Sequence, residues 1–297
     1  PETVIQGGGT RVHSLGSEGT AANALFEALG SPLPSQSVEI GDGHLGAAVT
    51  AGKIMFADSA DNWLNARLIL VWGGNPVVSN LHLWRRLQQA KRRGARLVCI
   101  DPLRSETAEK CPLHLAPMPG TDAALALAMM HVLIAENLID RDYIDQHTLG
   151  FDALAERVAA WTPARAAAET GLAAADILAL ARDYGGIRPA AIRINYGLQR
   201  CAGGGNAVRS IACLPALVGA WREPGGGILL SSSGNFPVDS QTLERPDLYP
   251  EHDRFPRRLI NMASIADALL EAAAPPLRAI CVYNSNPVAI ATDGVKV

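Results

Sequence analysis

Cysteines are few in this sequence, and no two of them form a CxxC motif. The chain has 297 residues and five cysteines, which are Cys99, Cys111, Cys201, Cys213 and Cys281. Zinc sites and small disulfide frameworks need closely spaced cysteines, so neither is expected to organise this fold. The thiols stand mainly in apolar contexts such as "LVCI" and "IACL", which predicts buried free cysteines and suits a reducing compartment.

Long hydrophobic runs are also missing. No apolar stretch reaches the ~20 residues that a membrane-spanning helix needs, so direct membrane insertion is not expected. Residues 1–10 lack the basic and apolar regions of a signal peptide, and the chain does not begin with Met. We therefore expect a piece of a longer polypeptide. Its compartment stays open between the cytoplasm, which is slightly favoured, and the periplasm.

An excess of basic charge is absent as well. Lys and Arg number 26 against 29 Asp and Glu, giving a formal net charge of -3. The strongest basic run, residues 91–96, ends a predicted helix, where cations complement the helix dipole. No aromatic residues are interleaved with it, so nucleic-acid binding is not expected. The 48% hydrophobic and 19% charged residues indicate an ordinary folded protein.

The sequence does contain one strand-and-turn pattern at two places, "LVWGGNPV" at residues 70–77 and "CVYNSNPV" at residues 281–288. In each copy an apolar strand runs into a small polar turn that ends in Asn-Pro. Around the first copy, residues 66–72 and 95–101 are continuous apolar runs, and residues 81–94 repeat apolar side chains at helical spacing. Strand, helix and strand at this spacing predict a right-handed βαβ unit.

The rest of the chain continues this alternation. Further helices are expected over residues 122–137, 174–185, 207–221 and 261–273. A further strand is expected over residues 189–197, and residues 230–258 form a turn-rich stretch of a length that usually has a function. Alternating strands and helices predict the α/β class with parallel sheets.

Polar residues follow the predicted strands, and ligands of parallel α/β sheets bind beyond the carboxyl ends of strands. The Gly73–Gly74 pair allows close backbone approach to a ligand, although the GxGxxG fingerprint is absent and a purely structural turn is the alternative. Asp101 can accept both hydroxyls of a ribose, and Arg104 suits a phosphate or a purine edge. Thr121 and Asp122 begin a predicted helix, either as a plain N-cap pair or with Asp122 accepting two hydrogen bonds from a guanine.

Several longer segments occur together in an order that resembles one known family. They are "LILVWGGNPVVSNLH", "IDPLRSETAEKCPLHLAPMPGTDAALALAMMHVLIAENLIDRDYI", "TLGF", "YGLQRCAGGGNAVRSIACLPALVGAW", "PGGG" and "RAICVYNSNPV". In combination they are similar to the molybdopterin oxidoreductases of the dimethyl sulfoxide reductase type, which include formate dehydrogenases and nitrate reductases. The resemblance runs from about residue 10 to the end of the chain.

The resemblance implies the central portion of a catalytic subunit, with two Rossmann-like, doubly wound α/β domains that are incomplete here. Residues 1–36 would be the first part of a discontinuous domain, residues 37–187 an inserted dinucleotide-binding domain, and residues 188–297 the truncated second part of the first domain. In the family, such domains hold Mo or W between two molybdopterin guanine dinucleotides (bis-MGD). A 4Fe-4S cluster would lie in a preceding segment.

The resemblance also assigns site residues. The first dinucleotide site would comprise Trp72, Gly73, Gly74, Asn75, Pro76, Ser79, Asp101, Pro102, Arg104, Ser105, Gly120, Thr121 and Asp122. The second dinucleotide site would begin with Tyr283, Asn284, Ser285, Asn286 and Pro287. A pterin loop, near the pterins and the metal, would use Gly197, Gln199, Arg200 and Asn206. Within it, residues 203–205 give the backbone freedom to wrap a bulky ligand, or they form a flexible surface loop.

The expected metal ligand is missing from the sequence. Relatives commonly place a Cys, selenocysteine, Ser or Asp at the start of the second α/β domain, where "SVEIGDGHLGAAV" aligns Gly41 with the ligand. Glycine has no donor atom, so no metal ligand and no catalytic residue are assigned. Glu39 and Asp42 would reach the metal only under a shifted alignment, and His44 is expected at the surface or beside the site.

Two functions from different classes follow from the resemblance. The first is an enzyme that carries out two-electron oxidation or reduction of a small substrate at Mo or W, with a possible electron-transfer subunit as partner. The second is a non-catalytic scaffold subunit of an electron-transfer complex, which Gly41 favours and Asp101, Arg104 and Asp122 oppose. A plain nucleotide-binding Rossmann protein is a third alternative, opposed by the second Asn-Pro turn. We expect the enzyme, and we expect the isolated 297 residues to hold no pterin or metal.

Overall fold

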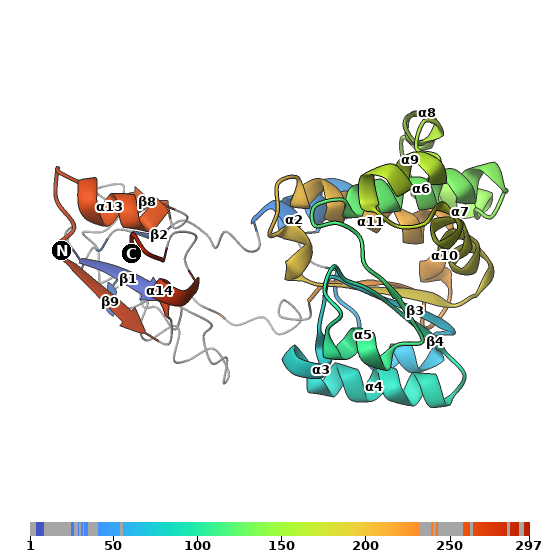
Figure 1. Cartoon of the computed structure of the whole chain (residues 1–297), viewed down its shortest axis with the longest axis horizontal. Helices are drawn as coiled ribbons and strands as arrows, with labels where there is room; N and C mark the ends of the chain where they lie inside the picture. Colours follow the sequence, from blue (N-terminus) through green and yellow to red (C-terminus); the bar gives the residue numbers. More distant parts are fainter. Residues whose placement is uncertain are drawn as a thin grey trace. The chain divides into compact units, whose positions relative to one another are not determined.

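A computed structural model of the chain describes residues 4–8, 25–26, 29, 31, 33–34, 41–53, 56–231, 239, 242, 258–261, 264–283, 286–290 and 294–297. The chain divides into two compact units. The larger unit is residues 39–235, and the smaller unit joins residues 1–38 to residues 236–297. Figure 1 shows the elements of both, and each unit is described by itself.

The larger unit is built on a five-stranded sheet in which all neighbouring strands are parallel. In chain order the strands are β3 (Leu68–Trp72), β4 (Arg96–Ile100), β5 (Leu113–Leu115), β6 (Ala190–Ile194) and β7 (Gly227–Leu229). Their order across the sheet is β5-β4-β3-β6-β7. All residues of β3 and β6 are buried. Apolar sequence fits these strands because helices cover both faces of the sheet. The exception is Arg193 of β6, whose buried guanidinium donates to the carbonyl oxygens of Leu229 and Leu230.

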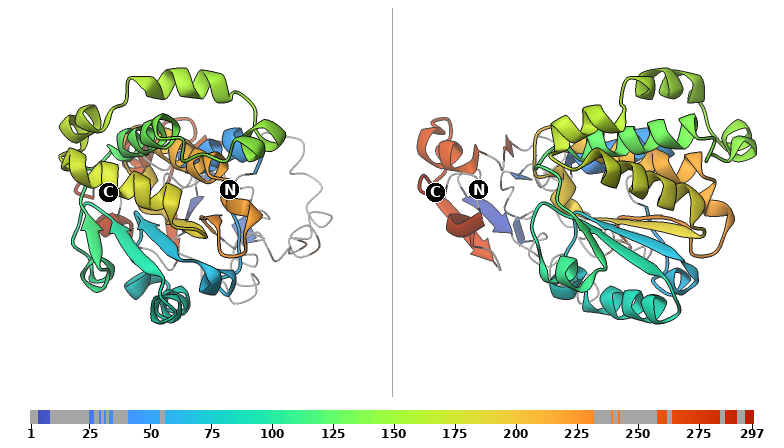
Figure 2. Two further views of the ribbon diagram at one scale, coloured as in Figure 1. Left: turned by 90° about the vertical axis from the view of Figure 1, so that its right-hand side faces the viewer. Right: turned by 45° about the vertical axis from the view of Figure 1, so that its right-hand side comes forward.

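Helices lie on both faces of this sheet. In chain order the larger unit contains α2 (Gly41–Ala51), η1 (Asn62–Asn65), α3 (Pro76–Ser79), α4 (Leu81–Arg92), α5 (Glu106–Lys110), α6 (Asp122–Ala135), α7 (Arg141–His147), α8 (Phe151–Ala159), α9 (Pro163–Thr170), α10 (Ala174–Gly186), η2 (Tyr196–Gln199), α11 (Gly204–Leu217) and η3 (Ala220–Arg222). Figures 1 and 2 show α3, α4 and α5 on one side of the sheet and α2, α6, α10 and α11 on the other. The larger unit is therefore a doubly wound α/β fold, the class that the sequence predicts.

The core of the larger unit lies in two layers, because successive side chains of a strand point to opposite faces of the sheet. On β3, Leu68, Leu70 and Trp72 enter the layer shared with α6, α10 and α11. Ile69 and Val71 enter the layer shared with α4. All of these side chains are completely buried, which explains why the strand carries no polar residue.

The winding of the chain reverses between the two central strands. From β3 the chain passes through α3 and α4 to β4, and from β6 it passes through η2 and α11 to β7 along the opposite face (Figure 2). Ligands of open α/β sheets bind at the carboxyl ends of strands where the winding reverses. In this fold that position is the adjacent ends of β3 and β6.

Sequence and structure agree on the elements of this unit but not on its boundary. The strands expected over residues 66–72, 95–101 and 189–197 are β3, β4 and β6, and α4, α6, α10 and α11 lie where helices are expected. Residues 188–235 contain β6, α11 and β7, which belong to the larger unit because β6 pairs along its whole length with β3. The compact units therefore separate after residue 235, not after residue 187.

The smaller unit contains two pairs of parallel strands. β1 (Val4–Gly8) pairs with β9 (Ala279–Tyr283), and β2 (Leu33–Pro34) pairs with β8 (Leu259–Ile260). In each pair, one strand comes from the first forty residues and the other from the last forty. The two ends of the chain therefore belong to one compact unit.

Helices and a small core complete the described part of the smaller unit. It contains α13 (Ile265–Glu271) and α14 (Pro287–Ile290), and Ile260, Ile265 and Leu277 form its core. Most of the turn-rich stretch 230–258 lies outside the described residues. None of the helices in the described part of the chain combines the length and the apolarity needed to span a bilayer.

Candidate functional site

Four turns of the larger unit meet at the carboxyl edge of its sheet. They follow β3, β4, β5 and β6, which are parallel and therefore end at the same edge (Figure 2). The first three turns carry the residues of the predicted first dinucleotide site, and the turn after β6 carries the start of the predicted pterin loop. The fold thus brings these separate sequence segments together.

The turns after β3 and β6 pack directly on one another, and glycine makes this approach possible. A Cβ on Gly73 would lie 2.8 Å from Cγ of Leu198, and a Cβ on Gly197 would lie 2.8 Å from the carbonyl oxygen of Gly73. A Cβ on Gly74 would lie 3.1 Å from Cβ of Asn195. Gly73 also has a φ of +62°, which residues with side chains rarely adopt. The two adjacent glycines therefore let the ends of the central strands close on each other.

A buried threonine holds the Asn75 turn. The hydroxyl of Thr107 donates to Oδ1 of Asn75 at 2.7 Å and accepts from the backbone N–H of Val77 at 3.2 Å. Thr107 lies on α5 and is completely buried, while the hydroxyl of Ser79 donates to the carbonyl oxygen of Asn75 at 3.0 Å. Sequence reasoning missed Thr107, because a threonine within a short helix gives no sign of a contact with a residue 32 positions away.

A hydrogen bond joins the end of β3 to the start of α6. Nε1 of Trp72 donates to Oδ1 of Asp122 at 2.7 Å, and both side chains are buried. Asp122 is the first residue of α6, where a carboxylate interacts favourably with the helix dipole. Thr121 is the N-cap residue, but its side chain makes no cap, because its hydroxyl donates to the carbonyl oxygen of Met118 at 2.7 Å. The plain N-cap interpretation therefore does not describe this pair.

Asp101 is half-buried at the end of β4. Its Oδ1 accepts the backbone N–H of Leu103 at 2.9 Å, and Nε2 of His114 lies 2.8 Å from its carbonyl oxygen. Burial raises the pKa of Asp101, although the Leu103 N–H and His114 act in the opposite direction. Burial also raises the pKa of Asp122, which the Trp72 N–H lowers and the Asp101 charge raises further. Hydrogen-bond donors on a ligand would favour the ionised form of both carboxyl groups and so oppose the effect of burial.

The other residues of the first dinucleotide site are mostly exposed. Pro102 and Arg104 are exposed, and Ser105 caps α5 through its side chain. Gly120 is exposed with a φ of +83°, and a Cβ there would lie 3.8 Å from Sγ of Cys201. Glycine at this position keeps the backbone of the turn accessible.

Cys201 is a neighbour of this site that sequence reasoning did not single out. Its thiol lies close to Gly120 and donates to the carbonyl oxygen of Leu198 at 3.5 Å. Burial raises the pKa of Cys201, and the charge of Asp122 raises it further. Cys201 therefore remains a neutral thiol at the edge of the site.

The pterin loop meets the start of α2 around Gln199. Gln199 is 5% exposed, and its Oε1 accepts the backbone N–H of Gly43 at 2.7 Å. A Cβ on Gly43 would lie 2.3 Å from Cδ of Gln199, and a Cβ on Gly204 would lie 2.4 Å from its Cα. Gly43 and Gly204 therefore allow the backbone to pack closely around Gln199. The buried Nε2 donor of Gln199 has no acceptor among the described residues.

The start of α2 contains Gly41, the position that the resemblance aligns with the metal ligand of relatives. Gly41 is the first residue of the helix and is exposed, and Asp42 beside it is exposed too. His44 is half-buried, its ring meets Tyr196 edge-on, and burial lowers its pKa. Glu39 lies outside the described residues. Within the described part of the chain, no three His, Cys, Asp or Glu side chains gather where they could hold a metal ion.

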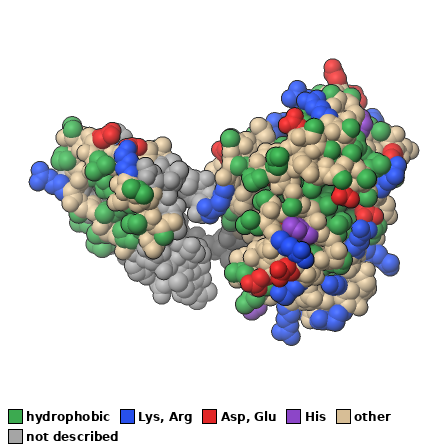
Figure 3. All heavy atoms as spheres, viewed as in Figure 1, with side chains coloured by type: hydrophobic (Ala, Val, Ile, Leu, Met, Phe, Trp, Pro, Cys, Tyr) green, Lys and Arg blue, Asp and Glu red, His purple; other side chains and the backbone are tan. Residues whose placement is uncertain are grey.

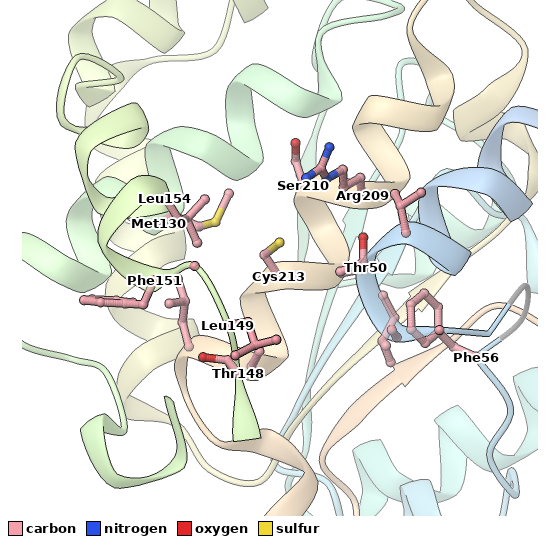
Figure 4. Close-up of a pocket in the computed structure, with 18 of the residues that line it drawn as sticks. Thr50, Phe56, Met130, Thr148, Leu149, Phe151, Leu154, Arg209, Ser210 and Cys213 are labelled. Carbon is pink, nitrogen blue, oxygen red and sulfur yellow. The ribbon is translucent and has the colours of Figure 1, made fainter. Parts of the chain in front are cut away.

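A hollow of about 1790 Å³ opens beside α11. Figure 4 shows Cys213 of α11 between Phe56 on one side and Leu154 on the other. Most of the lining is apolar, and none of its described residues is acidic. Asn206 of the predicted pterin loop belongs to this lining, whereas Arg200 is exposed in the loop before α11. The structure thus places Asn206 on α11, in the wall of this hollow.

Charges of both signs are mixed on the surface. On the face of the larger unit shown in Figure 3, acidic side chains lie beside basic ones. Ion pairs such as Arg182 with Glu136 and Arg96 with Asp183 contribute to this mixture.

The second Asn-Pro dipeptide also stands at the start of a short helix that follows a strand, in the smaller unit. β3 leads through Asn75 into α3, and β9 leads through Asn286 into α14, and each of these four-residue helices begins at its proline. Oδ1 of Asn286 accepts the backbone N–H of Ala289 at 3.3 Å. Two residues of the predicted second dinucleotide site, Asn284 and Ser285, lie outside the described residues, and so does the side chain of Tyr283. The duplicated sequence pattern therefore encodes a duplicated strand and helix start, although Oδ1 of Asn75 accepts from Thr107 and Oδ1 of Asn286 accepts from the helix backbone.

The amino-acid sequence of the chain is similar to those of known proteins. The family pattern described as "Molybdopterin oxidoreductase" matches residues 3–280. The chain is 36% identical over 273 residues to the probable oxidoreductase YoaE of Bacillus subtilis, a match that covers 92% of this chain and 39% of that protein. It is 33% identical over 187 residues to formate dehydrogenase H of Escherichia coli, which covers 63% of this chain and 26% of that enzyme.

A solved structure shares the fold. Acetylene hydratase from Pelobacter acetylenicus matches with a TM-score of 0.72 and 23% identity, over 97% of this chain and 44% of the hydratase chain. The chain spans less than half the length of these relatives. Because the family pattern extends over nearly all of its residues, and because its parallel sheet gathers the expected turns at one edge, the chain belongs to the molybdopterin oxidoreductase family.

Proposed function

We propose that this chain is the central cofactor-binding portion of a molybdenum or tungsten oxidoreductase. The enzyme would carry bis-MGD and catalyse the two-electron oxidation or reduction of a small molecule. The observation that supports this most is that two carboxyl groups, Asp101 after β4 and Asp122 at the start of α6, stand at the carboxyl edge of the parallel sheet, where the Trp72 N–H fixes Asp122. The family match and the formate dehydrogenase among the relatives agree with it.

The residues at this edge fit a guanine dinucleotide by their chemistry. An ionised carboxylate only accepts hydrogen bonds, so Asp122 suits the N1–H and N2–H₂ donors of a guanine. Asp101 in the same way suits the two hydroxyls of a ribose, as acidic residues do in other dinucleotide folds. The exposed guanidinium of Arg104 suits phosphate oxygens. Each side chain is thus paired with the part of the dinucleotide whose hydrogen-bonding groups and charge complement its own.

The buried amide of Gln199 fits the pterin end of the cofactor. Its Nε2 has no partner among the described residues, and leaving such a donor buried and unpaired costs about 1–3 kcal/mol. A pterin presents a carbonyl oxygen and ring nitrogens that accept hydrogen bonds. We propose that Gln199 donates to this ring while its Oε1 continues to hold the N–H of Gly43. The start of α2 would then be positioned against the cofactor.

The protein's contribution would be binding and orientation. When bound, the metal and its dithiolene sulfurs would supply the two-electron chemistry. Asp101 and Asp122 would anchor the nucleotide tail, and Gln199 would orient the pterin, so the reactive end is fixed by contacts along the whole cofactor. An iron–sulfur cluster in another segment, and an electron-transfer subunit, would connect this centre to its redox partner.

One observation favours a second function, a scaffold that keeps the fold without the metal. Gly41 stands at the aligned ligand position, and a Cβ placed on it would meet nothing within 4 Å. The described residues near it therefore leave open space and no donor atom where relatives place a metal ligand. The retained carboxyl pair argues against this alternative, because a scaffold has no need for groups that recognise a nucleotide.

The test uses the longest natural polypeptide that contains this chain, purified from cells supplied with molybdate and tungstate. Metal analysis and pterin fluorescence measure the bound cofactor. We expect stoichiometric Mo or W with two pterins per chain in the wild type. Asp122→Asn places an amide N–H₂ opposite the N–H donors of the guanine, so the hydrogen bonds to a charged group are lost. Cofactor retention should therefore fall at least about tenfold.

A matched control separates loss of recognition from general damage. Glu156→Gln changes the charge in the same way on an exposed position of α8, and it should retain the cofactor fully. Wild-type protein with neither metal nor pterin would support the scaffold function instead. Full retention in Asp122→Asn would show that the nucleotide binds elsewhere.

A further inference from the structure

Two cysteines that the proposed function does not use lie together between the sheet and α4. Cys99 belongs to β4 and is completely buried, and Cys111 directly follows α5 and is half-buried. Side chains two residues apart on a strand share a face, so Cys99 lies on the face of Leu97, which packs in the layer shared with α4. Cys111 packs against that same layer.

The two thiols face the same layer and are close enough for each to change the pKa of the other, and the charge of Lys91 acts on Cys111. Nζ of Lys91, near the end of α4, donates to the carbonyl oxygen of Lys110 at 3.1 Å, next to Cys111 in the chain. The Cys99 hydrogen bond and the Lys91 charge lower the pKa of Cys111, although its burial acts in the opposite direction. The same hydrogen bond and burial raise the pKa of Cys99. Because Cys99 is completely buried and Cys111 is half-buried, Cys111 is the sulfur that a dissolved oxidant reaches, and the lowered pKa of Cys111 agrees with this order.

We infer that Cys99 and Cys111 form a redox-reversible dithiol, a modification site that a hydroperoxide converts into an internal disulfide. With hydrogen peroxide, the Cys111 sulfur breaks the O–O bond and becomes a sulfenic acid, releasing one water. The Cys99 sulfur then attacks the Cys111 sulfur, the S–S bond forms, and the hydroxyl leaves with the Cys99 proton as a second water. The two electrons lost by the thiols reduce the peroxide, and a thiol reductant reverses the step.

A metal-binding interpretation of the pair is not supported. Within the described part of the chain, no third His, Cys, Asp or Glu completes a group that could hold a metal ion. The disulfide would close residues 99–111 into a ring that includes Asp101 and Thr107, the hydrogen-bond partner of Asn75. Oxidation would thus restrain the segment that follows β4. The reaction at the sulfurs is independent of the proposed function, because no cofactor takes part in it.

Peptide mapping of the oxidised whole chain tests the inference. After treatment with hydrogen peroxide, free thiols are blocked with N-ethylmaleimide, and the protein is digested with trypsin without reduction. Trypsin places Cys99 in peptide 97–104 and Cys111 in peptide 111–141. We expect these two peptides to be joined, and to separate on reduction, under conditions that leave Cys213 as a free thiol. Absence of the joined pair, or equal joining to any other cysteine, overturns the inference.

Serine variants test the order of the two sulfurs. In Cys99→Ser, peroxide should leave a sulfenic acid at Cys111 that dimedone traps. In Cys111→Ser, the buried Cys99 should stay unmodified, and in the matched control Cys213→Ser the joined peptides should form as in the wild type. Circular dichroism reports whether each variant folds, and the wild-type map decides the question where a variant does not. Trapping at Cys99 with Cys111 unmodified would contradict the assigned order.

Discussion

The indole N–H of Trp72 is buried, and its hydrogen bond goes to Asp122. Asp122→Ala leaves this donor without its acceptor, so we expect the unfolding free energy to fall by about 1–3 kcal/mol. Asp122→Asn keeps a carbonyl oxygen at the same place, so its loss should be clearly smaller. Urea unfolding of the two variants measures the difference. Equal losses would mean that the negative charge, not the acceptor, is what stabilises this contact.

The same carboxyl group predicts a pH dependence of stability. Burial raises the pKa of Asp122 in the folded chain above the ordinary value of 3.8. The folded state therefore keeps this proton to higher pH than the unfolded state, and the stability it gives below 3.8 is lost as the pH rises through the raised pKa. Asp122→Asn has no such proton, so its unfolding free energy should rise relative to the wild type as the pH increases from near 3.8 to neutral.

Urea unfolding at a series of pH values checks this trend. Glu156→Gln, at an exposed position on α8, is the control and should stay parallel to the wild type. A difference between Asp122→Asn and the wild type that does not change with pH would contradict the raised pKa.

The sequence predicts candidate site residues that lie in turns beside strands or at helix starts. It does not predict residues that reach the site through a contact with a distant segment. Asp101 follows a predicted strand and Asp122 begins a predicted helix, and the structure places both at the carboxyl edge of the sheet. Thr107 contacts Asn75, and Cys201 lies close to Gly120, only because the fold brings distant segments of the chain together. Gln199 was predicted near a ligand, but its bond to the start of α2 could not be read from its own segment.

At the scale of elements, the buried strands were the easiest to predict and α2 the hardest. β3 is buried on both faces and is a continuous apolar run, and β6 is apolar except for the buried Arg193. α2 contains Gly41, Gly43 and Gly46, and glycine is unfavourable in helices, so the sequence did not predict a helix there. Close packing against α11 and Gln199 is the tertiary requirement that overrides this propensity.

This packing predicts opposite effects for two glycine substitutions in one helix. A Cβ on Gly46 would lie 2.2 Å from the carbonyl oxygen of Gly205 in α11, which is backbone and cannot move aside easily. We therefore expect Gly46→Ala to lower the unfolding free energy by about 1–3 kcal/mol, as overpacking does. Gly41→Ala is the control, because a Cβ there meets nothing within 4 Å and alanine favours a helix. Thermal unfolding would contradict this account if Gly46→Ala were as stable as Gly41→Ala.

At the scale of the whole molecule, the domain boundary expected after residue 187 differs from the division of the structure into compact units after residue 235. By resemblance, residues 188–297 are expected to form the second part of the first domain, and this range begins with the strand expected over residues 189–197. In the structure this strand is β6, which pairs with β3 in the centre of the larger sheet. Pairing between strands more than a hundred residues apart leaves no local signal, so the boundary could not be placed from sequence patterns.

Two fragments test this boundary directly. Residues 39–235 contain all five strands of the sheet and both layers of its core, so we expect this fragment to fold and to unfold in one cooperative transition. Residues 39–187 lack β6, β7 and α11. Without them β3 loses a hydrogen-bonded neighbour, and apolar side chains such as Ile192, Val208 and Ile211 are missing from the core. This shorter fragment should therefore show no cooperative transition in circular dichroism, and a sharp transition in it would restore the boundary after residue 187.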